Sequence, residues 1–174
     1  FRQLDTDARQ DYEAFIQDKS EWLDEYALFM AIRNHQQNQH WLNWPEPLRD
    51  RHPGSIQHAR QELQDEIGNI KFEQYVFFQQ WHELKEYAHQ HKVYLFGDMP
   101  IFVSHDSAEV WAHREYFAID EHGKALTVAG VPPDYVSETG QRWGNPHYNW
   151  ERMQEDGFHW WLKRMQTQLE LFDI

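Results

Sequence analysis

The stretch "KVYLFGDMPIFV", residues 92–103, decides the fold class. Val93 to Phe96 form a short continuous apolar run ended by a glycine, which is typical of a parallel strand buried on both faces. A long apolar helical pattern over residues 56–89 precedes it. A second helical pattern, over residues 158–172, leads into the closing "LFDI", which indicates the entry to another buried strand. This order predicts an α/β protein with parallel strands.

Shorter elements are expected around these. The spacing of apolar residues near the start predicts an amphipathic helix, and clustered prolines predict an irregular connection after it. We expect a helix over residues 11–33, an irregular connection over 44–55, a break in the long helix near Gly68, a short helix over 107–117, and two strands over 117–128 around a turn at His122 and Gly123.

Composition limits the partners of the chain. Its 174 residues include no cysteine, which excludes disulfides and thiolate chemistry and fits a cytoplasmic protein. The formal charge is −13, from 16 basic and 29 acidic residues, so phosphate backbones would be repelled and we expect no nucleic-acid partner. No apolar run approaches the roughly 18 to 20 residues of a membrane span, and we expect no membrane partner.

Asp98 is the first candidate site residue. It directly follows the expected buried strand, and ligands of α/β proteins gather at the carboxyl ends of their strands. The alternative is a structural role, because an aspartate after a glycine often only caps a turn.

The stretch "VAGVPPDYVSETGQRWGNP", residues 128–146, is a candidate ligand-binding loop. Its three glycines and three prolines argue against a helix or a central strand. Asp134 lies in a stiff turn, while Tyr135 and Trp143 offer flat faces on which sugar rings can stack. The alternative is a packed surface loop whose aromatic side chains pin it to the body.

Metal and phosphate chemistry find little support. The stretch "HELKE" at His82 begins like a zinc helix motif, but Glu86 stands where the second histidine is required. Nucleophile-elbow, P-loop and dinucleotide patterns are absent from the sequence. We therefore expect no metal.

Several long blocks resemble a known family. Residues 96–117, 128–150 and 157–174 resemble consecutive blocks of the 4-alpha-glucanotransferases called amylomaltases or disproportionating enzymes, and residues 21–32 and 72–88 do so more weakly. The resemblance implies part of a (β/α)8 TIM-type barrel with a helical insertion subdomain. Residues 1–60 would form the insertion subdomain and connection, and residues 61–174 part of the catalytic barrel, with an active-site lid loop at 128–146.

The resemblance also implies an activity. Enzymes of this family transfer α-1,4-glucan segments between maltodextrins, glucose included, by retaining double displacement and without a cofactor. This chemistry needs a nucleophilic carboxylate and a second carboxyl as acid and base. In the family both follow the segment that matches "LELFDI", so we expect them beyond Ile174, in a longer protein of which this chain is an inactive piece. Asp173 precedes that block and is not expected to be the nucleophile.

Substrate-binding residues can be carried over by position. Asp98 matches a family aspartate near the donor sugar, and Asp134 with Tyr135 falls in the loop that covers the cleft. Trp143 and Asn145 match residues that line the cleft. Val136 replaces the usual phenylalanine, which leaves acceptor preference open. A non-catalytic α-glucan-binding module is the alternative function, and a scaffold without sugar binding is a third.

Overall fold

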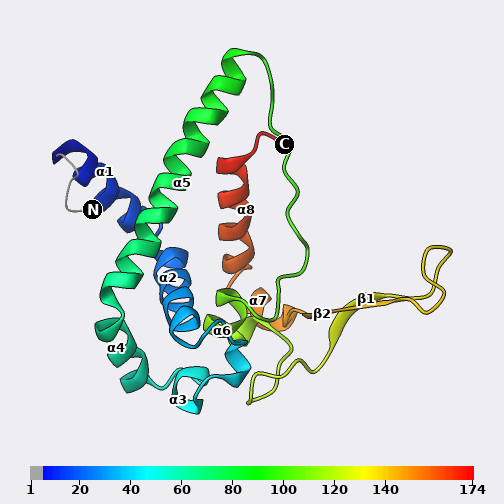
Figure 1. Cartoon of the computed structure of the whole chain (residues 1–174). Helices are drawn as coiled ribbons and strands as arrows, with labels where there is room; N and C mark the ends of the chain where they lie inside the picture. The colour runs from blue at the N-terminus through cyan, green and yellow to red at the C-terminus, as the bar shows by residue number, and fades with distance from the viewer. Residues whose placement is uncertain (1–5) are drawn as a thin grey trace.

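A computed structural model describes residues 6–174 as a mainly helical body from which one two-stranded ribbon projects (Figure 1). The helices and strands are α1 (Thr6–Asp18), α2 (Ser20–His35), the 3-10 helix η1 (Trp41–Asn43), α3 (Glu46–Arg49), α4 (Pro53–Glu62), α5 (Gln64–Gln90), α6 (Ala108–Ala112), the 3-10 helix η2 (Arg114–Tyr116), β1 (Val128–Val131), β2 (Gln141–Pro146), α7 (Trp150–Glu155) and α8 (His159–Leu171). In the described part of the chain, no helix is both long and apolar enough to cross a membrane.

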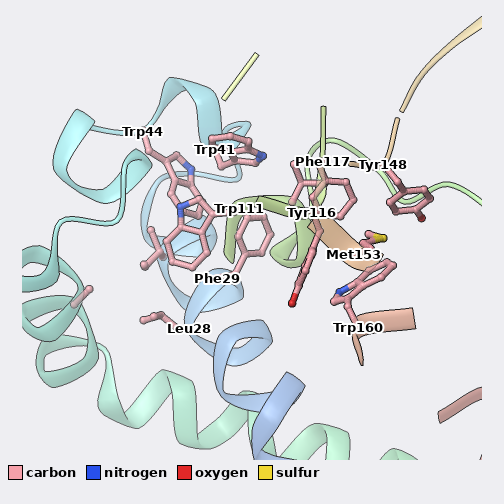
Figure 2. Close-up of a cluster of buried hydrophobic side chains, with 13 residues drawn as sticks. Leu28, Phe29, Trp41, Trp44, Trp111, Tyr116, Phe117, Tyr148, Met153 and Trp160 are labelled. Atoms are coloured by element: carbon pink, nitrogen blue, oxygen red, sulfur yellow. The ribbon is translucent and has the colours of Figure 1, made fainter. Parts of the chain in front are cut away.

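An aromatic core holds the helices together. Tryptophan, phenylalanine and tyrosine side chains from α2, η1, α6, η2 and α8 meet in one buried cluster, which excludes water over a large apolar area (Figure 2). The cluster contains residues from before and after position 60. The predicted division into residues 1–60 and 61–174 stays a prediction, and residues 1–5 lie outside the described part of the chain. Its buried members include Leu28, Phe29, Trp41, Trp44, Trp111, Tyr116, Phe117, Tyr148, Met153 and Trp160.

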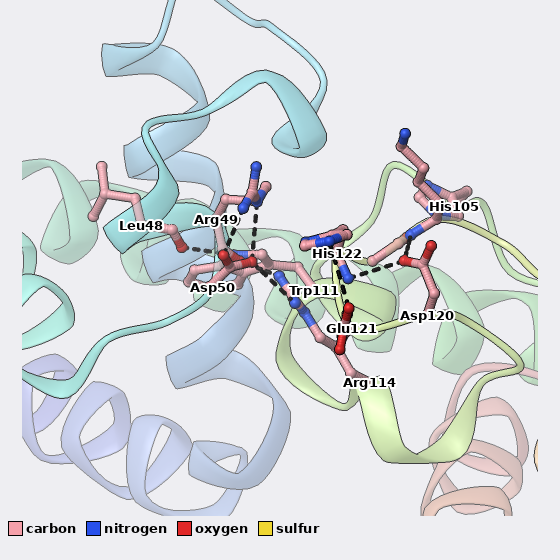
Figure 3. Close-up of polar contacts among 11 residues, drawn as sticks. Leu48, Arg49, Asp50, His105, Trp111, Arg114, Asp120, Glu121 and His122 are labelled. Atoms are coloured by element: carbon pink, nitrogen blue, oxygen red, sulfur yellow. Dashed lines mark hydrogen bonds and ion pairs between the residues drawn. The ribbon is translucent and has the colours of Figure 1, made fainter.

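The connection over residues 44–55 is better ordered than expected, because it contains α3 and the start of α4. The Nη1 atom of Arg114 donates to Asp50 Oδ1 at 3.2 Å, and its Nη2 atom donates to the carbonyl of Arg49 (Figure 3). Arg49 also donates two hydrogen bonds to the Asp50 carboxylate, at 3.0 and 2.6 Å. The Arg49 bonds are the largest cause that lowers the pKa of Asp50.

The predicted turn at His122 and Gly123 is confirmed. Asp120 Oδ1 accepts hydrogen bonds from the backbone nitrogens of His122 and Lys124, at 2.9 and 2.8 Å (Figure 3). Gly123 has a φ of +82° and lies against the buried ring of Trp41. The two strands expected around this turn are wrong, since only an isolated bridge joins Ile119 to Ala125.

Two helix boundaries differ from the prediction. The helix expected over residues 11–33 is divided at Lys19, so that α1 packs Tyr12 against Tyr75 of α5 while Ala27 and Ala31 of α2 pack against the same helix. The long helix is broken at Leu63, which packs on the core, and the expected break near Gly68 is wrong. Tertiary packing therefore overrides local propensity at both positions.

The two expected buried strands are also wrong as strands. Residues 93–96 and the closing residues 172–174 have no strand assignment, and Val93 and Phe96 are 52% and 77% exposed. The segments nevertheless lie side by side in the same direction, since Asp173 N donates to Leu95 O at 2.9 Å and Gly97 N to Ile174 O at 2.8 Å. A central parallel strand needs a neighbour on each side, and residues 6–174 supply one.

The stretch 128–146 is a hairpin rather than an irregular loop. Strands β1 and β2 pair antiparallel, with Gly130 opposite Arg142 and a register irregularity between Val128 and Gly130. A Cβ atom on Gly130 would overlap the carbonyl oxygen of Gln141, so only glycine permits this close approach. The prolines lie at the ends of the strands, where no ladder hydrogen bond is lost. The ribbon extends well away from the helices (Figure 1).

Candidate functional site

Asp98 lies in residues 97–103, a segment without helix or strand structure within the connection from α5 to α6. Its carboxylate is exposed and forms no hydrogen bond or ion pair with any other residue of 6–174. The side chain therefore does not cap a turn, which was the structural alternative. An unpartnered carboxylate on the surface is available to a ligand.

The start of this segment is held by Asp173. The Oδ2 atom of Asp173 accepts from Leu95 N at 2.8 Å, while its Oδ1 atom lies 2.9 Å from His89 Nε2 and 3.4 Å from Lys85 Nζ. The hydrogen bond from His89, followed by that from Leu95, lowers the pKa of Asp173 to about 2. Asp173 is thus an anchoring residue between α5 and the segment of Asp98.

Acid should weaken this anchor in a defined window. Because the pKa of Asp173 falls from 3.8 to about 2 on folding, its stabilising contribution is fully present only well above pH 3.8 and is lost as the pH falls through 3.8 towards 2. We expect the stability of the native protein to decrease more steeply between pH 5 and about 2.5 than that of the Asp173→Asn variant. Urea unfolding at both pH values measures the difference. Equal decreases in the two proteins would contradict this assignment.

Three side chains bind the segment after Asp98 through its backbone carbonyl groups. Arg164 Nη2 donates to Pro100 O at 2.5 Å, and the Tyr148 hydroxyl donates to Ile101 O at 2.7 Å. Asn145 Nδ2 donates to Val103 O at 2.8 Å. Asn145, which was expected to line a cleft, thus ties the root of the hairpin to the segment of Asp98.

The tip of the hairpin, residues 132–140, is organised by Asp134. Its Oδ1 atom accepts from Val136 N at 2.9 Å and Ser137 N at 2.7 Å, which closes a tight turn. Tyr135 is fully exposed at this turn, and Val136 is exposed beside it. The alternative of a loop pinned to the body by its aromatic residues is therefore wrong for the tip.

Trp143 also faces solvent. Its side chain is 51% exposed, and its Nε1 atom donates to Gln141 Oε1 at 3.0 Å, which holds the indole along β2. The hydrogen bonds of the tip residues are internal to the hairpin. The described structure thus joins Asn145 to the segment of Asp98, but it does not bring Asp134 or Tyr135 into contact with that segment.

Comparison with known proteins identifies the family of the chain. The sequence profile of a family described as 4-alpha-glucanotransferase matches residues 1–174. The chain belongs to this family. It is 47% identical over 166 residues to the 4-alpha-glucanotransferase of Thermus thermophilus, and 45% identical over 166 residues to that of Synechocystis. Each alignment covers 95% of this chain and 33% of the relative.

A solved structure agrees with this assignment. The amylomaltase from Streptococcus agalactiae in complex with acarbose superposes with a TM-score of 0.91 at 39% sequence identity. The match covers 97% of this chain and 34% of the other. The chain thus spans about a third of the length of these 4-alpha-glucanotransferases.

The sequence gives no sign of the contacts that Tyr148 and Arg164 make with the segment of Asp98. Both donate to carbonyl groups far away in the sequence, and no spacing rule signals such a contact.

A hollow of about 450 Å³ between α5 and α8, lined by Trp22, Phe77 and Trp160 among others, was also missed and contains none of the expected sugar-binding residues. Within residues 6–174, no cluster of three or more His, Asp or Glu side chains could hold a metal ion.

Proposed function

We propose that the chain is part of an enzyme that transfers α-1,4-glucan segments between maltodextrins, with glucose as one acceptor, by retaining double displacement. Family membership along all 174 residues is the observation that carries this proposal. The acarbose bound by the Streptococcus amylomaltase supports a sugar-like ligand. The proposed enzyme acts in the cytoplasm, with which a chain free of cysteine is compatible.

The catalytic carboxylates belong, in this proposal, to the two thirds of the family's length that the chain does not span. A retaining mechanism needs two carboxyl groups about 5 to 5.5 Å apart across the scissile bond. Asp98 instead binds the donor sugar, since a charged carboxylate forms strong hydrogen bonds with sugar hydroxyl groups. Its exposure and its lack of a hydrogen-bond or ion-pair partner among residues 6–174 support this role.

We further propose that residues 61–174 belong to a (β/α)8 barrel, with residues 1–60 as a helical insertion subdomain and connection. The parallel contact between residues 95–97 and 173–174 supports neighbouring barrel strands. Exposed apolar side chains on both segments and on the adjacent face of α8 support burial by further strands and helices, among them Val93, Phe96, Leu162, Met165 and Leu169.

The hairpin acts in this proposal as a lid over the glucan. Tyr135 and Trp143 present flat faces that can stack on sugar rings, and the Asp134 turn stiffens the tip that carries Tyr135. A lid that excludes water favours transfer to a sugar over hydrolysis. The same exposed aromatic residues also favour the alternative of a glucan-binding module without catalysis.

Asp98→Asn tests the assignment of the donor site in a protein that contains this chain and has the full length of the family. We expect kcat/KM for maltotriose to fall roughly 10- to 100-fold, because a charge-assisted hydrogen bond contributes about 1.5 to 3 kcal/mol. Released glucose and longer maltodextrins are measured by chromatography. Glu83→Gln, which removes an exposed charge from α5, serves as the control. A kcat/KM equal to that of the control would contradict the role of Asp98.

Trp143→Ala tests the lid. We expect the KM for maltodextrins to rise about 10-fold, since an aromatic contact beyond simple burial contributes about 0.5 to 1.5 kcal/mol and the exposed ring adds apolar area. Steady-state kinetics on a maltodextrin series measures the change. Unchanged kinetics would refute the lid, and glucan affinity by calorimetry without any transfer would favour the binding module.

A further inference from the structure

We propose that Arg164 and Tyr148 form a positioning pair that sets the location of the Asp98 carboxylate relative to the root of the hairpin. This inference rests on the proposed glucan transfer, in which Asp98 contacts the donor sugar. Neither residue is expected to touch the substrate. They act through the backbone of residues 100–103.

Arg164 is fixed in orientation by its surroundings. Its Nη2 atom donates to Pro100 O at 2.5 Å and its Nη1 atom lies 3.4 Å from the Tyr148 hydroxyl. The guanidinium carbon lies 5.5 Å from the ring of Trp160 and 5.2 Å from the ring of Trp161. A planar guanidinium can make both polar contacts while it stacks on the rings, whereas the ammonium of a lysine cannot reproduce this geometry.

Tyr148 is buried and connects three parts of the chain. Its hydroxyl donates to Ile101 O at 2.7 Å, and its ring is stacked on Phe102 with 5.9 Å between centroids. It also forms a β-bridge with Phe117 and follows closely after β2, so it belongs to the root of the hairpin. The same side chain therefore holds the Asp98 segment against the base of the proposed lid.

The position of Asp98 depends on these backbone contacts because its own side chain has no partner in residues 6–174. The preceding residues are held by Asp173 and Ile174, and the following residues by Arg164 and Tyr148. Between the two anchors the carboxylate is free but its backbone is restrained. A displacement of a binding group by about 1 Å is enough to lower a catalytic rate roughly 100-fold.

The test is a double-mutant cycle in a protein of full family length that contains this chain. Tyr148→Phe removes only the hydroxyl and keeps the buried ring, and Arg164→Lys keeps the charge. We expect either change to lower kcat/KM for maltotriose roughly 10-fold, with kcat affected more than KM. In the Asp98→Asn background, neither change should lower kcat/KM further, because the group that they position is already impaired.

The controls separate positioning from stability. Lys163→Gln, on the same helix, removes the ion pair with Glu21 and should leave kcat/KM unchanged. The melting temperature of each variant is measured in parallel, since a purely structural role would lower it while folded enzyme kept its kcat/KM. Equal losses of kcat/KM in the native and Asp98→Asn backgrounds, or no loss of kcat/KM in either single variant, would overturn the proposed positioning role of Arg164 and Tyr148. A native protein with no transfer activity would instead overturn the proposed function, and this inference with it.

Discussion

Trp111→Ala is expected to lower the free energy of unfolding by roughly 3 to 5 kcal/mol, the range found when a large aromatic side chain is removed from a core. Trp111 has no exposed surface and packs on Phe29 and Trp44, with ring centroids 5.8 and 5.6 Å away. Its Nε1 atom donates to Leu48 O at 3.1 Å, and the guanidinium of Arg51 lies 4.1 Å from its ring. The substitution thus leaves a cavity and an unstacked arginine, and it removes the side-chain hydrogen bond to Leu48 O, which keeps its backbone bond from Arg51 N.

Urea unfolding followed by circular dichroism measures this loss. Trp150→Ala provides the matched control, because Trp150 is about half exposed and its removal should change stability by less than about 1 kcal/mol. Trp111→Phe refills part of the cavity and should recover part of the loss. If Trp111→Ala and Trp150→Ala lowered stability equally, the core would not be organised around Trp111.

Gly123→Ala is expected to lower the free energy of unfolding by about 3 kcal/mol. Gly123 has a φ of +82°, a conformation that disfavours a side chain by about 1 to 2 kcal/mol. A Cβ atom there would also overlap the ring of Trp41, which has no exposed surface and is stacked on His105 with centroids 5.3 Å apart. Overpacking of this kind adds about 1 to 3 kcal/mol.

Gly144→Ala separates the two contributions. Gly144 has the same φ of +82°, but a Cβ atom at that position would meet nothing within 4 Å. We expect this variant to lose only the conformational part, about 1 kcal/mol. Thermal unfolding of both variants gives the difference, which reports the contact with Trp41. Equal losses at the two glycines would show that the ring can move aside.

The helical pattern was predictable from the sequence, but the helix breaks were not. The apolar periods of α2, α5 and α8 are local properties, and they are confirmed. The breaks at Lys19 and Leu63 serve packing against α5 and the core, which depends on residues distant in the sequence. The expected break at Gly68 is absent because a single glycine lowers helix stability only modestly.

Strand formation was harder to predict from the sequence than helix formation. An apolar run such as residues 93–96 reports that a segment prefers burial, whereas a strand exists only when neighbours satisfy its backbone. The hairpin at 128–146 shows the reverse case, since its prolines and glycines argue against a helix or a central strand, yet Gly130 permits two strands to pair closely. Pairing partners, rather than composition, decide both outcomes.

Candidate site residues could be predicted where their position in the sequence alone indicates that the side chain is exposed or closes a turn. Asp98 and Tyr135 are exposed, as a ligand-binding role requires, and Asp134 also closes its own turn. Tyr148 and Arg164 could not be found in this way, because their hydrogen bonds reach 47 and 64 residues back along the chain. The sugar-binding roles of Asp98, Asp134 and Tyr135 stay predictions.

The contact between residues 95–97 and 173–174 also bears on the order of folding. Its partners are 78 residues apart, whereas α5 and α8 are stabilised within their own turns. Closing so large a loop is slow compared with helix formation, so we expect the helices to form first and the segment of Asp98 to be placed last. A kinetically trapped chain would then have nearly native helical content and a misplaced Asp98. For this protein, helical circular dichroism is therefore a poor measure of how many molecules have the segment of Asp98 in its native position.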